Sequence, residues 1–158
     1  MIRNLIILDN EGHALLSANF GECHSMANDE QAVSGFISAL HSFSKMLAAG
    51  DLSEIQLGSL SFLLMTHREH LFAISADDDK TDVNRTKLNK IVQLFVEQCL
   101  GGRDSSGEIS EVCSSFTEHL LEERILQRNC GKHDDCADCQ NRHKSLPLSE
   151  MHSEIESR

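Results

Sequence analysis

The sequence predicts an α/β fold in which helices cover a five-stranded antiparallel sheet, with the element order β-β-α-β-β-β-α-α. Apolar runs of strand length occur as a pair near the N-terminus and as a group of three in mid-chain, and helical patterns follow each group. Every connection between strands is short enough for antiparallel pairing, apart from the one that carries the first helix. At 158 residues, 40% of them hydrophobic, the chain can build one core of this kind.

The first two strands are expected at residues 2–9 and 14–20, in the runs IRNLIILD and ALLSANF. The turn residues Asn10, Glu11 and Gly12 lie between these runs. Because such a short polar connection joins antiparallel strands, the two runs are predicted to form a β-hairpin.

A helix of about 20 residues is expected between Asn28, a polar cap followed by acidic residues, and Gly50, which ends it. Its apolar side chains occupy about 200° of the helix circumference, against roughly 100° for a helix with one buried stripe. We expect the sheet to cover the centre of this arc and the margin to be only partly covered. The central residues are Phe36, Leu40, Phe43 and Leu47, and the marginal ones are Val33 and Ile37.

Three further strands are expected at residues 52–58, 60–67 and 70–77, arranged as a meander because only short breaks separate them. A second helix should begin at Thr81 and Asp82 and present an apolar stripe of Leu88, Ile91, Val92, Phe95 and Cys99. A third helix is expected over residues 107–127. Helical periodicity then fades, so the chain divides into a domain over residues 1–127 and a C-terminal extension over residues 128–158.

Two stretches of the sequence resemble a known family. The opening MIRNLIILDNEGHALLS resembles the start of the small sigma-type subunits of clathrin adaptors, and EIQLGSLSFLLMTHREHLFAISADDD resembles the meander of longin domains. With the element order, they make residues 1–127 similar to a longin domain of the simple archaeal kind. Roadblock domains resemble the same sheet but usually begin with an extra helix, whereas this chain enters a strand at Ile2.

The resemblance implies an interaction module and no enzyme. Longin and roadblock domains serve in vesicle-trafficking complexes and in regulators of small GTPases, so a small GTPase and another longin/roadblock-type subunit are the expected partners. A homodimer is a further possibility that the resemblance leaves open. It identifies no binding residue, because partner surfaces differ between members of the family.

The polar face of the first helix is a candidate partner surface. Ser34, Ser38, His41 and Ser42 lie on it with Lys45, which carries its single formal charge. Small uncharged side chains allow another backbone to approach at low desolvation cost. The same pattern is also typical of a solvated face, and both interpretations stay open.

The strand at residues 52–57 is a second candidate, because longin-type sheets leave an edge there. Exposed edges invite pairing with another chain. Its one central charge, Glu54, offers weak protection against such pairing.

The formal charge of −11 argues against a nucleic-acid surface, since nucleic-acid affinity depends on Lys and Arg neutralising phosphates. It also disfavours direct adsorption to anionic lipid. No apolar run approaches the roughly 20 residues of a membrane span, and the N-terminus becomes acidic too soon for a signal peptide. We therefore expect a cytoplasmic protein. No glycine loop precedes a G-K-[ST] triplet, which argues against nucleotide hydrolysis.

A Cys/His-rich stretch in the extension is the one serious candidate metal site. Its five potential zinc ligands are Cys130, His133, Cys136, Cys139 and His143. The composition suits a tetrahedral zinc site, but only two residues separate the first pair of ligands from the second. A redox pair of Cys136 and Cys139 and a tail without a specific ligand are the alternatives.

The sequence thus predicts a non-enzymatic interaction scaffold. Its expected partners are proteins of small-GTPase regulation or of membrane-trafficking complexes. The alternative is a small zinc-binding or redox-responsive protein that acts through its C-terminal segment. Zinc is the one cofactor that the residues suggest.

Replacing Cys136→Ser together with Cys139→Ser should leave the thermal stability of the domain over residues 1–127 nearly unchanged, because the two thiols lie beyond the predicted core. Thermal unfolding of the full chain followed by circular dichroism measures this. A large fall in the melting temperature would show that the extension belongs to the fold.

Overall fold

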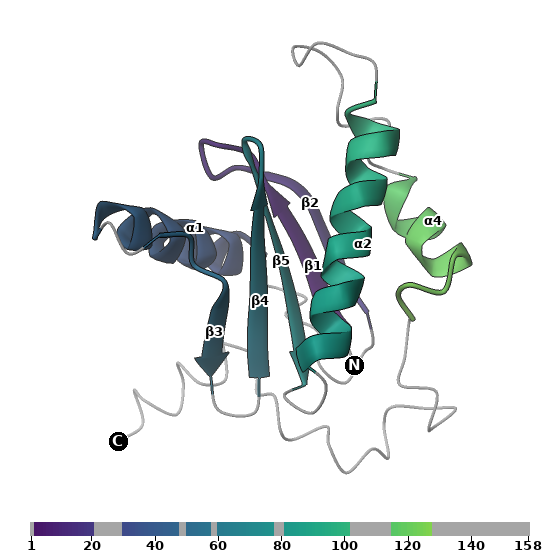
Figure 1. Cartoon of the computed structure of the whole chain (residues 1–158), viewed down its shortest axis with the longest axis horizontal. Coiled ribbons are helices and arrows are strands. Elements are labelled where there is room, and N and C mark those ends of the chain that lie inside the picture. The colour runs from purple at the N-terminus through teal and green to yellow at the C-terminus, as the bar shows by residue number, and fades with distance from the viewer. Residues whose placement is uncertain are drawn as a thin grey trace.

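A computed structural model gives the structure of the chain, and it describes residues 2–20, 30–47, 50–57, 60–77, 81–101 and 115–127. Figure 1 shows the elements along the chain. The strands are β1 (Ile2–Leu8), β2 (Ala14–Asn19), β3 (Glu54–Leu57), β4 (Leu60–His67) and β5 (His70–Asp77). The helices are α1 (Glu30–Met46), α2 (Thr81–Cys99) and α4 (Phe116–Glu122).

The five strands form one antiparallel sheet in the order β2-β1-β5-β4-β3. The predicted hairpin and meander are therefore both confirmed, and they join where β1 pairs with β5. β3 is shorter than predicted, since pairing with β4 begins only at Glu54. Both hairpin turns, β1–β2 and β4–β5, lie at the same end of the sheet (Figure 1).

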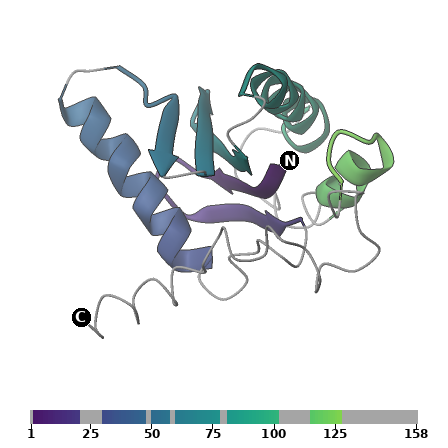
Figure 2. The same ribbon diagram turned by 90° about the horizontal axis from the view of Figure 1, so that it is seen from below.

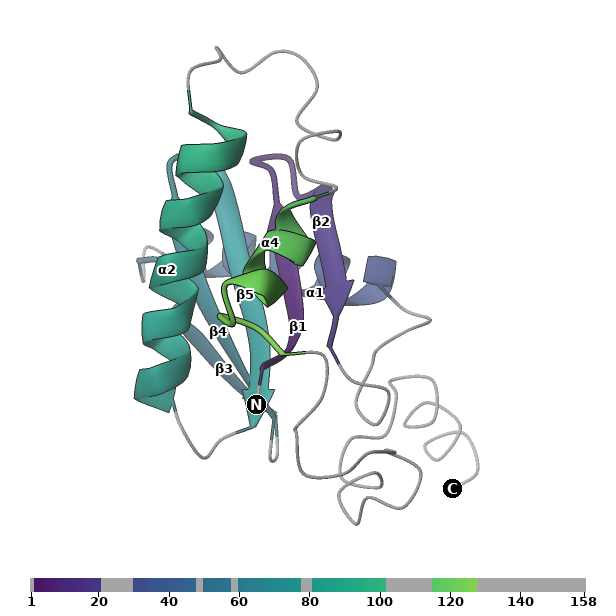
Figure 3. The same ribbon diagram turned by 90° about the vertical axis from the view of Figure 1, so that its right-hand side faces the viewer.

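The helices cover both faces of the sheet. In Figure 2 the sheet separates α1 from α2 and α4. Figure 3 shows α2 and α4 side by side in front of the sheet, with α1 behind it. The fold is thus a three-layer α/β/α arrangement with the predicted element order. Among the described residues, no helix is both long and apolar enough to cross a membrane.

Two hydrophobic clusters fill the spaces between these layers, because side chains alternate between the two faces of a strand. The larger cluster packs the face under α2 and α4, and the helices contribute residues such as Leu88, Phe95 and Phe116 to it. Phe95 lies edge-on to both Phe72 of β5 and Phe116 of α4, with ring centroids 5.3 and 5.4 Å apart. The smaller cluster lies on the opposite face, and Val33 and Ile37 are the buried members that α1 contributes among the described side chains.

The third helix is shorter than predicted at its C-terminal end. α4 ends at Glu122, and Arg124 takes a left-handed backbone conformation with φ 56°. The Ile125 N–H then donates to the Leu120 carbonyl at 3.0 Å, a Schellman-type termination. The turn places Ile125 in the larger cluster instead of continuing the helix. The expected helical start at residue 107 lies outside the described residues.

Gly12, in the β1–β2 turn, lies close to Ser38 of α1. Its φ of 88° lies in the left-handed region, which glycine adopts without a steric penalty. A Cβ atom at this position would overlap the Ser38 hydroxyl oxygen on α1. Gly35 on α1 differs, since nothing lies within 4 Å of the place where its Cβ would be.

Gly12→Ala and Gly35→Ala should therefore change stability in opposite directions. The first is expected to lower the free energy of unfolding by about 1–2 kcal/mol, through the left-handed backbone and the contact with Ser38. The second should raise it by about 0.5–1 kcal/mol, because alanine is the better helix former. Urea unfolding of both variants measures this, and a stable Gly12→Ala protein would contradict the described turn.

Candidate partner-binding surface

The sheet covers a different side of α1 from the one predicted. Val33 and Ile37 are buried against it, with 1% and 0% of their surface exposed. Phe36 and Phe43, expected at the centre of the buried stripe, are exposed instead, and Leu40 is half-buried. The predicted orientation was wrong: the margin of the apolar arc packs on the sheet.

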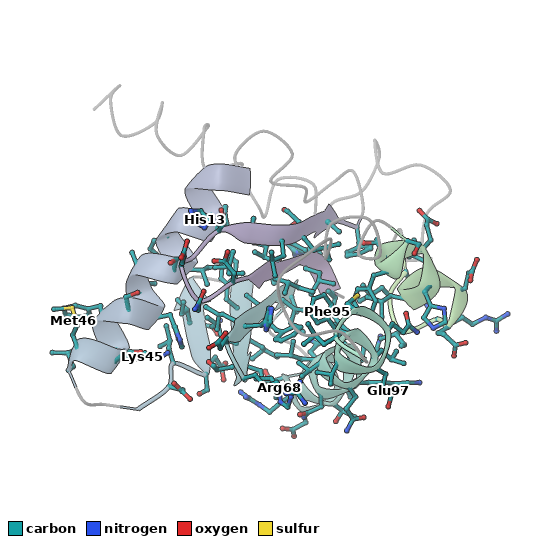
Figure 4. All side chains as sticks on the ribbon, turned by 90° about the horizontal axis from the view of Figure 1, so that it is seen from above. His13, Lys45, Met46, Arg68, Phe95 and Glu97 are labelled. Carbon is teal, nitrogen blue, oxygen red and sulfur yellow. The ribbon has the colours of Figure 1, made fainter. Side chains whose placement is uncertain are left out.

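The helix consequently displays large apolar side chains to solvent. Phe43, Leu47 and Met46 are 56%, 61% and 82% exposed, and Phe36 is also exposed. Figure 4 shows Met46 pointing away from the sheet. We call these four residues the apolar face of α1. Sequence reasoning missed Met46, and it found the other three but placed them in the core.

Packing explains this orientation. Phe62, Leu64 and Leu71 already supply bulky side chains on the sheet face under α1. The side chains of Val33 and Ile37 are less bulky than phenylalanine and complete the layer without overpacking. An apolar arc of about 200° is about twice what one sheet face covers, so either margin can be buried and the rest stays uncovered.

The polar residues predicted to face a partner are divided by this orientation. Ser34 and His41 are buried on the sheet side, Ser38 is half-buried, and Ser42 is exposed. The expectation of one solvent-facing polar surface is therefore corrected for Ser34 and His41, because the sheet lies against them. Whether Ser38 or Ser42 contacts a partner stays a prediction.

His41 is mainly uncharged at neutral pH. Burial lowers its pKa below the ordinary value of histidine, Lys45 lowers it further, and Asp51 acts weakly in the other direction. A neutral imidazole can lie against the sheet without the desolvation penalty of a charge.

β3 is an edge strand, as predicted, since it pairs only with β4. The Glu54 carboxylate lies 3.3 Å from the Arg85 guanidinium of α2 and accepts a hydrogen bond from the Ser61 hydroxyl at 3.3 Å. Glu54 thus links the edge strand to the helix on the α2 face. Both members of the ion pair are partly exposed, so the pair contributes little stability. A partner role for Glu54 stays a prediction.

The five Cys and His residues predicted as zinc ligands lie outside the described residues. Within the described ranges, no group of three or more His, Cys, Asp or Glu side chains could hold a metal ion. Zinc binding by Cys130, His133, Cys136, Cys139 and His143 therefore stays a prediction.

Comparisons with known proteins find matches among solved structures. No protein-family model and no curated protein matches the chain. Among solved structures, MglB of Myxococcus xanthus is similar over 78% of this chain and 83% of its own, with 11% identity and a TM-score of 0.34. The element order and sheet topology of the chain are themselves longin/roadblock-like, as the sequence resemblance implied.

Ile37→Ala and Phe43→Ala test the orientation of α1. Ile37→Ala should lower the free energy of unfolding by about 2–4 kcal/mol, because it opens a cavity under the helix. Phe43→Ala should change it by less than about 0.5 kcal/mol in dilute protein, where the ring faces water. Chemical denaturation distinguishes the two, and the reverse ranking would mean that the predicted orientation was right after all.

Proposed function

We propose that the chain is a protein-interaction scaffold that pairs through the apolar face of α1, and that the pair engages a small GTPase. The observation that carries the proposal is the uncovered apolar face, Phe36, Phe43, Met46 and Leu47, on a helix whose other side is packed on the sheet. Clustered apolar side chains on the surface of a soluble domain are typical of an interaction site.

A second copy of the chain is a suitable occupant of this face. Two α1 helices related by a twofold axis would each bury the same four side chains, which is how most homodimers are built. Removing one such side chain from water contributes about 1.5–3 kcal/mol when burial is complete. The face itself carries no formal charge, so the net charge of −11 is not concentrated where the copies would meet.

The position of β3 as the last strand of the described sheet supports an interface near the C-terminal end of α1. α1 crosses one face of the sheet and contacts β1 and β2, and its C-terminal end lies toward β3 in Figure 2. Leu52 and Ile55, from β3 and the segment before it, pack against the smaller cluster under α1. A partner seated on the C-terminal end of α1 would therefore also lie near the edge strand, and a related longin/roadblock-type subunit could use the same region.

The GTPase step rests on the resemblance to longin and roadblock domains. Under this proposal the chain needs no catalytic group of its own, because it would act by presenting a composite surface. Fold likeness alone does not determine function, so this step is tested separately from pairing.

Phe43→Glu should weaken self-association about tenfold or more, because a carboxylate would lose its hydration in an apolar interface. Sedimentation velocity over a range of protein concentrations measures the association constant. Val83→Glu is the matched control, since Val83 is an exposed apolar residue on α2.

Unchanged association of the control with weakened association of Phe43→Glu supports the proposed face. A wild-type chain that stays monomeric at high concentration and captures no longin/roadblock-type subunit would contradict it. Equal effects of the two variants would show that added negative charge, and not the location, is responsible.

A further inference from the structure

A polar cavity lies between α1 and the end of the sheet that carries both hairpin turns. Its volume is about 310 Å³, and its walls come from α1, the β1–β2 turn and the β4–β5 turn. This is within the usual range for a site that holds a small molecule. Ser38, His41, Ser42 and Lys45 of α1 line it, so the polar helix face found in the sequence faces a cavity.

Besides His70, two residues that line this cavity each have a buried polar atom with no hydrogen-bond partner in the described part of the chain. These atoms are Nδ1 of His41, a side chain only 9% exposed, and the hydroxyl oxygen of Thr66. Thr66 follows Phe62 and Leu64 at alternate positions of β4, so it lies on the sheet face toward α1. Buried polar groups are nearly always paired in folded proteins, and those that are not call for a structural or functional reason.

His70 also borders the cavity and also has an unpartnered ring nitrogen. Its ring, however, packs against the rings of Phe72 and Phe95, at centroid distances of 6.5 and 5.8 Å. These rings belong to the cluster under α2, on the opposite face of the sheet. We therefore leave His70 out of the candidate site.

Two cationic side chains border the cavity, one from the helix and one from a hairpin turn. Lys45 lies on α1, and Arg68 lies at the β4–β5 turn with a left-handed φ of 54°. Figure 4 views the molecule from this end and shows both residues. Neither forms an ion pair with any residue in the described part of the chain.

Asp9 and Glu69 also line the cavity and carry negative charge, but in the described part of the chain neither forms an ion pair with these cations. Asp9 accepts hydrogen bonds from the backbone N–H groups of Glu11 and His13, at 2.9 and 2.8 Å, and its other oxygen lies 3.3 Å from the His13 ring. Asp9 is therefore committed to its own turn. Glu69 is exposed beside Arg68. Lysine, arginine and the hydroxyl groups make the lining rich in hydrogen-bond donors.

The geometry points to a binding site for a small phosphate-bearing molecule or for inorganic phosphate itself, held by Lys45 and Arg68 over the buried His41 and Thr66. A tetrahedral oxyanion accepts hydrogen bonds on every oxygen, which matches a donor-rich lining with two unpaired cations. The cavity volume also leaves space for a short organic group attached to the phosphate. This site does not depend on the pairing through α1 that we propose above.

Isothermal titration of the full chain with inorganic phosphate, at constant ionic strength, tests the site. Saturable binding is expected, and Lys45→Gln with Arg68→Gln should weaken it about tenfold or more, since both charges are lost. Lys87→Gln with Lys90→Gln on α2 removes the same charge elsewhere and should leave the affinity unchanged. Absent binding, or an equal loss in both double variants, would overturn the proposal.

Titration with glycerol 3-phosphate distinguishes the two sources of the oxyanion. Tighter binding than inorganic phosphate shows that the cavity also takes the organic group, and equal affinity shows that the oxyanion alone is recognised. Either outcome supports the site, provided that the Lys45→Gln, Arg68→Gln double variant binds both molecules more weakly than the wild-type protein does.

Thr66→Val separates a binding role from a structural one. Valine has nearly the shape of threonine, so the unliganded protein should keep its melting temperature or gain a few degrees when an unpaired buried hydroxyl is removed. Phosphate affinity should fall several-fold. A lower melting temperature with unchanged phosphate affinity would show that the hydroxyl serves the fold and would overturn its role in the site.

Discussion

Burial of the central strands on both faces is the constraint on which the rest of the structure depends. All seven residues of β1 are buried, and in β5 the residues from Leu71 to Ala76 are buried as well. A sheet of this kind must be covered on both sides, because either face left open would expose a continuous apolar surface. The two sides are covered unequally. Among the side chains that the structure describes, α2 supplies four buried apolar ones and α1 supplies two.

This inequality explains why α1 carries both features of functional interest. The helix uses only one margin of a wide apolar arc against the sheet, so the large side chains on the other side stay uncovered. At its C-terminal half, polar residues take the place of apolar ones above the sheet, and the layer opens into the cavity under His41 and Lys45. The helix therefore covers the core with few residues and presents two chemically different surfaces.

Much of the fold could be predicted from sequence because its strands are short apolar runs with clear turns between them. The hairpin and the meander followed from short connections, whereas the pairing of β1 with β5, which sets the strand order, was not predicted. The orientation of α1 could not be predicted, since side-chain size ranked Phe36 and Phe43 above Val33 and Ile37 as core residues. What decided the outcome was the space left above Phe62, Leu64 and Leu71, and this space exists only once the sheet has formed. The end of α4 was also missed, because a left-handed Arg124 gives no glycine signal.

The candidate sites, like the orientation of α1, could be predicted only in part from the sequence. The edge position of β3 followed from the resemblance to longin-type sheets, and the polar residues of α1 were recognised as a group. Their common environment could not be inferred, because Thr66 and Arg68 reach the cavity from a hairpin that is distant from α1 in the sequence. Tertiary contacts of this kind carry no local pattern.

The weak attachment of α1 has a consequence for how the molecule opens. Regions held by few buried contacts separate from a folded protein at a lower free energy than the whole chain unfolds. The amide protons of α1 should therefore exchange through local opening of this helix, while those of α2 and the central strands exchange only through global unfolding. A partner that covers α1 would close this low-energy route, so assembly would slow the turnover of the chain as well as build a surface.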